Sequence, residues 1–203
     1  MKGFRMQFFM LPVMAFCLLA FTGGDGGKKK PARKKKPVAA SPKPKAKQPI
    51  VDLDSTENPY YIIVDKSDYE LKVYDDEGWY ATYPVVFGSK DLRDKYREGD
   101  KRTPDGQFKV VLKKIHPKWG HELLLDYPNP ESVRRFNERK QTGLVPKNAR
   151  IGNGIAIHAT RPGEEWTVDN YYNWTDGCVS VKYTEMKDLF SYIPVGTPVT
   201  IQQ

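Results

Sequence analysis

Short apolar runs of β type, separated by Gly, Pro and Asp, constrain the fold of this chain most. They follow one another from about Asn58 to the end of the sequence. Runs of this length are typical of strands, and the residues between them are typical of turns. The runs predicted as strands are 60–64, 71–74, 82–87, 107–112, 154–158, 178–181 and 198–201.

Two helices are predicted between these strands. The first begins at Asn129, an N-cap residue followed by proline at the first helical position, and ends at about Gln141. The second begins at about Thr184 and ends before Pro194. We therefore predict a mainly β fold, a β-sandwich or curled mixed sheet with a few peripheral helices.

The positive charge of the chain is confined to a segment before this region. The formal net charge is +8, but residues 28–47 hold nine Lys and one Arg and no acidic residue. From Gln48 onward there are 21 basic and 24 acidic residues, so the folded part is mildly acidic. A stretch rich in Lys, Pro and Ala buries little apolar area, which predicts a flexible linker over residues 25–50. This distribution argues against nucleic acid as the partner.

An apolar run from Phe8 to Phe21 follows Lys2 and Arg5 and precedes small residues. This is the layout of a secretory signal, and the run is shorter than the roughly 20 residues of a membrane-spanning helix. We expect residues 1–24 to be a signal peptide or an N-terminal membrane anchor. Lipidation at Cys17 is disfavoured because Phe16 stands where lipoprotein signals carry a small residue. The protein is expected to be exported to the periplasm or cell envelope.

Cys178 would be the only cysteine left after removal of a signal peptide. Without a disulfide partner, it is either a buried apolar residue or a reactive thiol. It follows a Thr175-Asp176-Gly177 turn, and His158 ends the preceding predicted strand. A nearby imidazole can take the proton of a thiol and return it to a leaving amine. The backbone N–H groups of Gly177 and Cys178 are candidate oxyanion donors. On this pair alone, a structural thiol with a core histidine is an equal alternative.

The pattern H-x(16)-T-D-G-C, from His158 to Cys178, resembles the L,D-transpeptidase catalytic domain, the YkuD-like family. That family's motif is a His followed, after a spacer, by Ser/Thr-His-Gly-Cys. A second likeness lies at residues 99–108, GDKRTPDGQF, which is similar to the family's G-x-x-x-T-P-x-G-x-F segment. The strands predicted at 60–64 and 71–74, followed by Pro84 to Gly88, resemble the family's opening hairpin. The resemblance covers about residues 58–203, and we place the catalytic domain at 51–203.

Two positions depart from the family motif. Asp176 stands where the family carries its second His, and Ser180 replaces the Arg or Asn that commonly stands two residues after the cysteine. A subgroup of the family has such an S/T-x-G-C variant, which makes His158 the match to the general base. Asp176 is either a site-tuning residue or a turn aspartate that bonds its own backbone. Further candidates for tuning the site or binding substrate are Thr175, Ala159, Arg161, Trp174 and Tyr172.

The resemblance implies a cysteine-dependent enzyme that modifies peptidoglycan stem peptides at the bond between diaminopimelate and D-Ala, through a thioester. The thioester is resolved by an amine, which gives an L,D-transpeptidase, or by water, which gives an L,D-carboxypeptidase or endopeptidase. Hydrolysis of peptidoglycan–lipoprotein links on the same site is a further alternative, as is a non-catalytic wall-binding module.

We expect no cofactor and no metal. Residues His116 and His121 do not share one helical face, so zinc binding is disfavoured. Stem peptides are the expected partners, with envelope lipoprotein or anionic wall polymers as further candidates, and the protein is expected to be a monomer.

Overall fold

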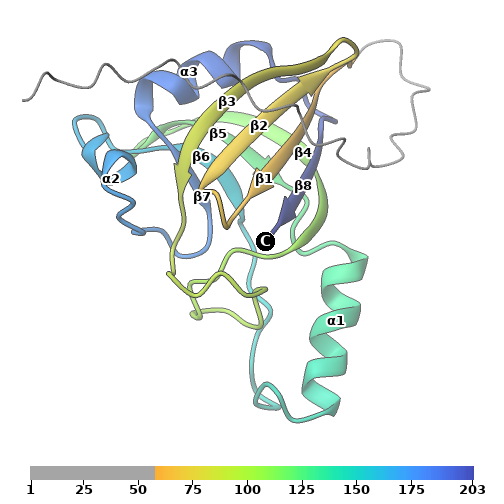
Figure 1. Ribbon diagram of the computed structural model, residues 1–203. Helices are drawn as coiled ribbons and strands as arrows, with labels where there is room; N and C mark the ends of the chain where they lie inside the picture. Colours follow the sequence, from red (N-terminus) through yellow and green to blue (C-terminus); the bar gives the residue numbers. More distant parts are fainter. Residues whose placement is uncertain (1–57) are drawn as a thin grey trace, which may run out of the picture. The chain divides into compact units, whose positions relative to one another are not determined.

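A computed structural model describes residues 58–203. The expected signal and linker segments, 1–24 and 25–50, lie outside the described residues. Eight strands and three helices form the described part (Figure 1). The strands are β1 (Tyr61–Asp65), β2 (Glu70–Asp75), β3 (Gly78–Val86), β4 (Gly106–His116), β5 (Gly120–Leu125), β6 (Ala156–Ala159), β7 (Val179–Val181) and β8 (Pro198–Gln202). The helices are α1 (Pro130–Gln141), α2 (Trp166–Asp169) and α3 (Tyr183–Tyr192).

The strands form a sheet that closes into a barrel in the order β1-β2-β3-β7-β6-β5-β4-β8. Two neighbouring pairs are parallel, β1 with β8 and β6 with β7. The other pairs are antiparallel. The predicted mainly β fold with a few helices is therefore confirmed, and the curled mixed sheet is the form that it takes.

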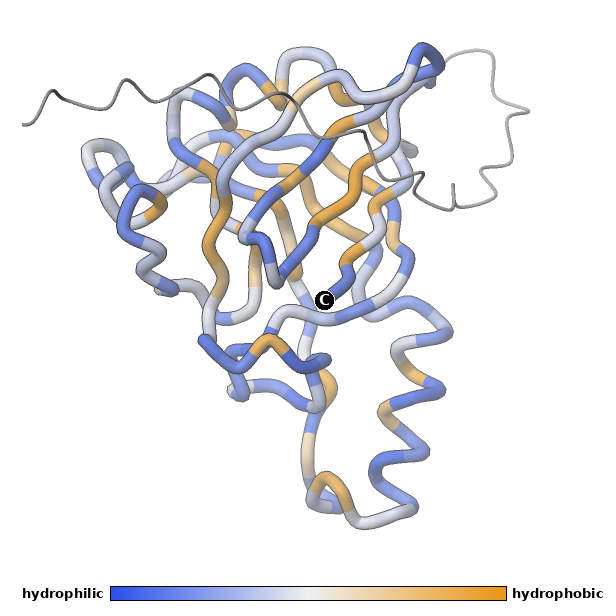
Figure 2. Tube along the Cα trace, in the orientation of Figure 1, coloured by the Kyte–Doolittle hydropathy of each residue, from blue (hydrophilic) through white to orange (hydrophobic). Residues whose placement is uncertain are grey.

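Alternating side chains fill the barrel. In β1, Ile62 and Val64 are buried while their neighbours are partly exposed, and β2 repeats the pattern with Leu71 and Val73. Figure 2 shows the apolar residues concentrated on the strands. Because a strand turns successive side chains to opposite faces, one face of each strand builds the core. The other face of β6 and β7 is then free to carry polar side chains.

The first predicted helix is confirmed as α1. Asn129 Oδ1 accepts hydrogen bonds from the Ser132 N–H and hydroxyl, both at 3.0 Å, and Pro130 occupies the first helical position. The second predicted helix corresponds to α3, which buries Met186 and Leu189. No helix of residues 58–203 combines the length and apolar character that crossing a bilayer requires.

Two elements were missing from the sequence prediction. Strand β5 pairs with β4 and with β6, and it directly precedes the segment that leads to α1. Its Glu122 is buried although charged, so the run does not read as a core strand. Helix α2 has only four residues, which is too short for a periodic signal.

Candidate active site

The sheet register brings the predicted nucleophile and base together. In the parallel pair of β6 and β7, Ile157 lies opposite Val179 and His158 lies opposite Ser180. Ile157 and Val179 belong to the core, so His158 and Ser180 point to the opposite face. Cys178 precedes Val179 and continues this alternation. His158 and Cys178 are therefore diagonal neighbours on one face of the sheet.

The His158 imidazole is fixed in one tautomer. It is buried, and its Nδ1 lies 2.8 Å from the carbonyl oxygen of Ala159. A carbonyl only accepts, so Nδ1 carries the hydrogen and Nε2 has a free lone pair. Burial lowers the pKa of His158 below its ordinary value, against the opposing effects of the Ala159 carbonyl and the Glu122 carboxylate. The imidazole is thus neutral near pH 7 and able to accept a proton.

The Cys178 thiol is held close to β6. Its Sγ lies 3.5 Å from the carbonyl oxygen of Gly154. The pKa of the thiol is raised to about 11, mainly by burial; the charges of Glu122 and Asp176 add to this rise, and the Ala156 N–H and Lys95 oppose it. A protonated thiol beside a neutral imidazole calls for general-base assistance, because the attacking species is the thiolate.

Residues 175–178, which we call the nucleophile turn, are stabilised by hydrogen bonds within the turn. The Thr175 hydroxyl donates to the Cys178 carbonyl at 2.8 Å and accepts from the Gly177 N–H at 3.2 Å. The Gly177 N–H, predicted as an oxyanion donor, is therefore already engaged in this structure. The role of the Gly177 and Cys178 N–H groups as oxyanion donors stays a prediction, and Gly177 would have to release the Thr175 hydroxyl to take part. Thr175 and Ala159 have structural contacts with the nucleophile and the base, respectively.

Glycines let the nucleophile turn fit against a neighbouring loop. Gly177 has a φ of +124°, and a methyl group on its Cα would lie 2.6 Å from the Arg102 carbonyl oxygen. A methyl group on Gly88 would lie 2.4 Å from the Thr175 carbonyl oxygen and 2.5 Å from that of Lys101. All three distances are shorter than a real side-chain carbon comes to its neighbours. Residues 87–105, the β3–β4 loop, thus pack tightly on the nucleophile turn.

Two tryptophans line the base. The ring centroid of Trp119 lies 5.1 Å from that of His158, and the centroid of Trp174 lies 5.4 Å away, edge to face. The Arg161 guanidinium lies over Trp174, 5.2 Å from its centroid. Trp174 therefore lies beside the His158 ring and Arg161 lies over Trp174, and their roles in tuning the site or binding substrate stay predictions. Trp119 was not predicted, because a single tryptophan in a hairpin turn gives no signal of its own.

Glu122 is a further site residue that the sequence did not reveal. It lies opposite His158 in the pairing of β5 with β6 and is buried. Its carboxylate accepts from Trp119 Nε1 at 3.1 Å and pairs with Lys114 at 3.2 Å. Glu122 therefore holds the indole that lines the base and places a negative charge near it.

The other predicted residues lie farther out. Asp176 and Tyr172 are exposed, and the Tyr172 ring lies 5.5 Å from that of Trp166. The His116 ring stacks on the Trp119 ring, with 3.9 Å between the ring centroids, whereas His121 contacts Phe190. Within residues 58–203, no group of three or more metal-ligating side chains is found.

Unsatisfied polar atoms surround His158. In the described part of the chain, Thr160 Oγ1, Trp174 Nε1 and Ser180 Oγ are buried without a hydrogen-bond partner. Ser180 lies opposite His158 in the strand pairing. Thr160 follows Ala159, whose carbonyl oxygen holds the His158 ring, and Trp174 contacts that ring. Buried polar groups without partners are costly, and they often mark a functional site. The arrangement combines a thiol, a base and open donors, as acyl transfer requires.

Comparisons with known proteins agree on the fold. The structure resembles Bd1075 of Bdellovibrio bacteriovorus with a TM-score of 0.51 and 23% identity, over 72% of this chain and 48% of that one. It also resembles the helical cell shape determining protein Pgp2 of Campylobacter jejuni with a TM-score of 0.53 and 20% identity, over 73% and 49% of the two chains. The chain thus spans about half the length of these proteins. No curated protein sequence matches it.

The sequence itself carries the family assignment. Residues 59–201 match the profile of the YkuD family, described as the L,D-transpeptidase catalytic domain. The match includes His158, Cys178 and all of the barrel strands, except for Gln202, the last residue of β8. It extends over more than half of the 203 residues. The predicted resemblance is confirmed, and the chain belongs to the L,D-transpeptidase catalytic domain family.

Proposed function

We propose that this protein is an L,D-transpeptidase that acts on peptidoglycan stem peptides through Cys178. The observation that carries the proposal is the placement of His158 and Cys178 on one face of two adjacent parallel strands, with a neutral imidazole whose Nε2 is free to accept. The family match over residues 59–201 supports the substrate class.

In the proposed first step, His158 Nε2 takes the thiol proton and Cys178 Sγ attacks the diaminopimelate carbonyl carbon of a tetrapeptide stem. The carbon–nitrogen bond to D-Ala breaks, and the imidazolium returns its proton to the leaving amine. A thioester remains on Cys178. The Cys178 N–H is the expected donor to the oxyanion.

In the second step, the side-chain amine of another stem peptide attacks the thioester carbonyl. His158 takes a proton from that amine, the carbon–sulfur bond breaks, and the thiolate is protonated again. The product is a cross-link between two diaminopimelate residues. Attack by water instead would release a tripeptide and make the enzyme a carboxypeptidase.

Incubation of the full chain with purified tetrapeptide muropeptides, followed by mass spectrometry, tests the proposal. A cross-linked dimer with one D-Ala released supports transfer. Tripeptide without dimer would show hydrolysis, and unchanged muropeptide would show a binding module. The matched control is Cys178→Ala, which we expect to fold normally and to release no D-Ala.

Export is part of the same proposal. Peptidoglycan lies outside the cytoplasmic membrane, and the apolar segment before residue 24 has the layout of a secretory signal. We therefore propose a location in the periplasm or cell envelope. The Lys-rich segment would also suit anionic wall polymers as a second partner.

A further inference from the structure

Lys95 is a buried cation next to the nucleophile turn. It lies in the β3–β4 loop, and its side chain is 4% exposed. Its Nζ lies 2.8 Å from Asp100 Oδ1 and 3.4 Å from the Arg102 carbonyl oxygen. Burying an ammonium is costly unless it is paired and hydrogen-bonded. Both conditions are met here, so the position of the charge is well defined.

Asp100 is itself fixed by the backbone of the loop. Its carboxylate accepts from the N–H groups of Tyr96, Arg97 and Arg102 at 2.7, 3.0 and 3.1 Å. These donors hold the carboxylate, and the carboxylate holds Lys95. Lys95 therefore has little freedom to move away from the turn.

The ammonium lies against the backbone that carries the thiol. A methyl group on Gly177 Cα would lie 3.4 Å from Lys95 Nζ. Gly177 directly precedes Cys178, so the absence of a side chain at Gly177 allows this approach. A cation next to a cysteine favours the thiolate form.

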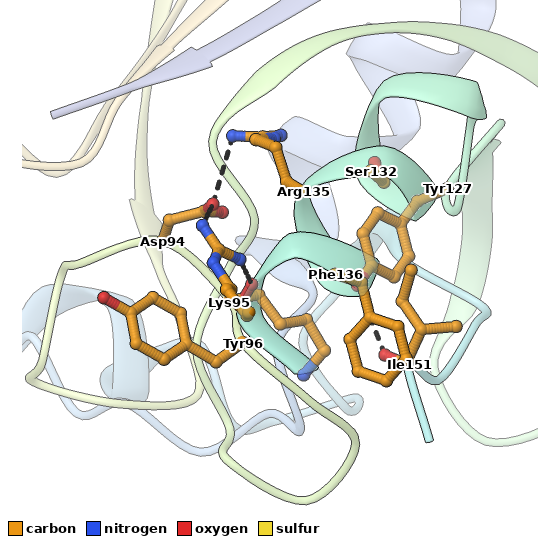
Figure 3. Close-up of a pocket in the computed structure, with 9 residues that line it drawn as sticks. Asp94, Lys95, Tyr96, Tyr127, Ser132, Arg135, Phe136 and Ile151 are labelled. Atoms are coloured by element: carbon orange, nitrogen blue, oxygen red, sulfur yellow. Dashed lines mark hydrogen bonds and ion pairs between the residues drawn. The ribbon is translucent and has the colours of Figure 1, made fainter. Parts of the chain in front are cut away.

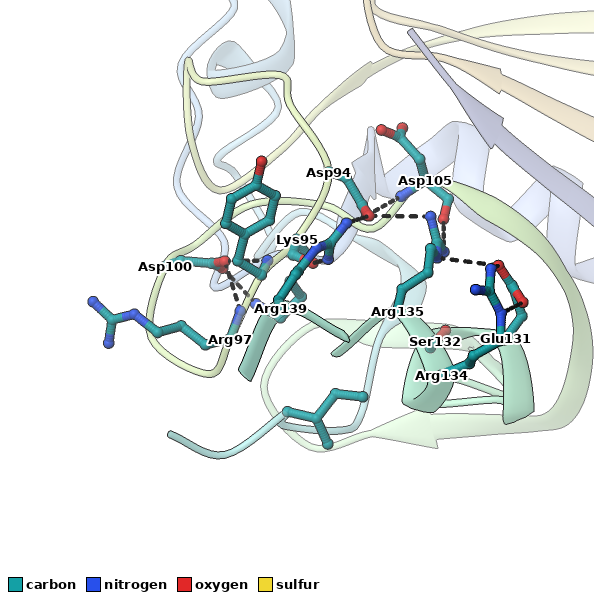
Figure 4. A network of polar contacts seen from close by, with 12 residues as sticks. Asp94, Lys95, Arg97, Asp100, Asp105, Glu131, Ser132, Arg134, Arg135 and Arg139 are labelled. Atoms are coloured by element: carbon teal, nitrogen blue, oxygen red, sulfur yellow. Dashed lines mark hydrogen bonds and ion pairs between the residues drawn. The ribbon is translucent and has the colours of Figure 1, made fainter. Parts of the chain in front are cut away.

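Helix α1 keeps the loop in place from the other side. Arg139 donates to the Lys95 carbonyl oxygen at 2.8 Å and to Asp94 Oδ2 at 2.5 Å, and Arg135 donates to the same oxygen at 3.0 Å (Figure 4). Figure 3 shows these residues around a small cavity between the loop and α1. The helix thus supports the segment that presents Lys95.

The charges around Cys178 come from several elements. Glu122 on β5 and Asp176 on the nucleophile turn raise the pKa of the thiol, and Lys95 on the β3–β4 loop lowers it. His158 on β6 is neutral and adds no charge at rest. Lys95 therefore opposes two carboxylates and the effect of burial.

We propose that Lys95 is a positioning residue for catalysis: its ammonium, held by Asp100 against Gly177, stabilises the negative charge that forms on Cys178 Sγ. The inference rests on the proposed function in taking Cys178 as the nucleophile. It adds a residue from the β3–β4 loop to the thiol and imidazole on the strands.

Alkylation of Cys178 by iodoacetamide tests the proposal without any peptidoglycan substrate. The full chain is used, and peptide mass spectrometry separates Cys178 from Cys17. Below the pKa of the thiol, the rate follows the thiolate fraction. We expect Lys95→Met to lower the rate about tenfold at each pH between roughly 7 and 9, the effect of one pKa unit. Lys95→Arg should keep most of the parent rate.

Lys66→Met is the matched control. Lys66 is also buried and holds the same loop, through Asp105 at 2.6 Å and the Thr103 carbonyl at 3.3 Å. Its loss should destabilise the loop without displacing the pH profile of alkylation. An unchanged profile in Lys95→Met, or an equal displacement in Lys66→Met, would overturn the proposal.

Circular dichroism establishes that each variant is folded. If Lys95→Met does not fold, Lys95→Gln takes its place, because its amide can still donate to Asp100 and carries no charge. A displaced profile in an enzyme that leaves muropeptides unchanged would refute the proposed function and support the role of Lys95. Muropeptide turnover by the parent, with an alkylation profile that Lys95→Met does not displace, would support the proposed function and refute the role of Lys95.

Discussion

Replacement of His158 by Gln removes the general base and keeps a polar side chain of similar size. The parent enzyme begins the reaction with a protonated thiol, because burial raises the pKa of Cys178 to about 11. In the proposed mechanism, His158 overcomes this by taking the proton as the thiol attacks. Without it, the variant reacts only through the thiolate already present.

The size of the effect follows from that pKa. At pH 7.5 the thiol is about 3.5 pH units below its pKa, so roughly one molecule in three thousand carries a thiolate. We therefore expect acylation to slow by about three orders of magnitude, within the range of roughly 10²–10⁴ that a positioned base contributes. The variant's rate should also rise about tenfold per pH unit up to about pH 10.

The parent should behave differently over the same range. Burial lowers the pKa of His158 below its ordinary value, so the imidazole loses its proton at a lower pH than in the unfolded chain. The base is then available throughout neutral pH. The parent's rate should fall only where acid protonates His158, and it should be nearly flat from about pH 7 to 8.

Acylation by a carbapenem, followed by intact-protein mass spectrometry, measures this step alone. The strained lactam carbonyl accepts the sulfur and leaves a stable mass increase, so no acceptor amine is needed. Asp176→Ala is the control: its exposed carboxylate raises the pKa of the thiol, so its removal should leave the rate equal or slightly higher. Parent-like acylation by His158→Gln together with an inactive Asp176→Ala would refute the assignment of the base.

Three further predictions concern other parts of the protein. Gly88→Ala should destabilise the fold by roughly 1–3 kcal/mol or more and slow acylation, since the new methyl group would lie 2.4 Å from the Thr175 carbonyl; thermal unfolding measures this. Glu122→Gln removes a charge that raises the pKa of His158, so the acid limb of the pH–rate profile should move to lower pH. An acid limb at the same pH in Glu122→Gln and the parent would contradict this role of Glu122. The protein should be recovered outside the cytoplasmic membrane, and limited proteolysis should leave a core that begins near residue 50; full-length protein in the cytosol would count against export.

The strands and the pair of catalytic candidates were predictable because their signals are local. Alternating apolar residues mark β1 and β2, and a His at the end of one apolar run with a Cys at the start of the next places both at the edge of strands. Because β6 and β7 are adjacent and parallel, the His158 and Cys178 side chains lie on the same face of the sheet. The family motif indicated that His158 and Cys178 act together, a question that their spacing in the sequence left open.

The surroundings of the site were not predictable in the same way. The β3–β4 loop carries many charged residues, a composition that indicates a solvated surface segment. Yet Lys66 and Lys95 are buried against it and within it, each paired with an aspartate of the loop. Such burial depends on partners that only the folded chain brings together, and no periodicity records them. The same holds for Glu122, because a charged residue in the run 120–125 argues against a buried strand in the sequence.

The pairing of the first strand with the last has a consequence for how the domain folds. Strand β8 completes the barrel by pairing with β1 on one edge and β4 on the other, so Ile62 lies beside Val199. Contacts that distant in sequence form late, because closing a long loop costs entropy before it gains any contact. Until β8 pairs, β1 and β4 therefore each keep one unpaired sheet edge. We expect the apolar interior of the barrel to be fully closed only when β8 has paired with both of these strands.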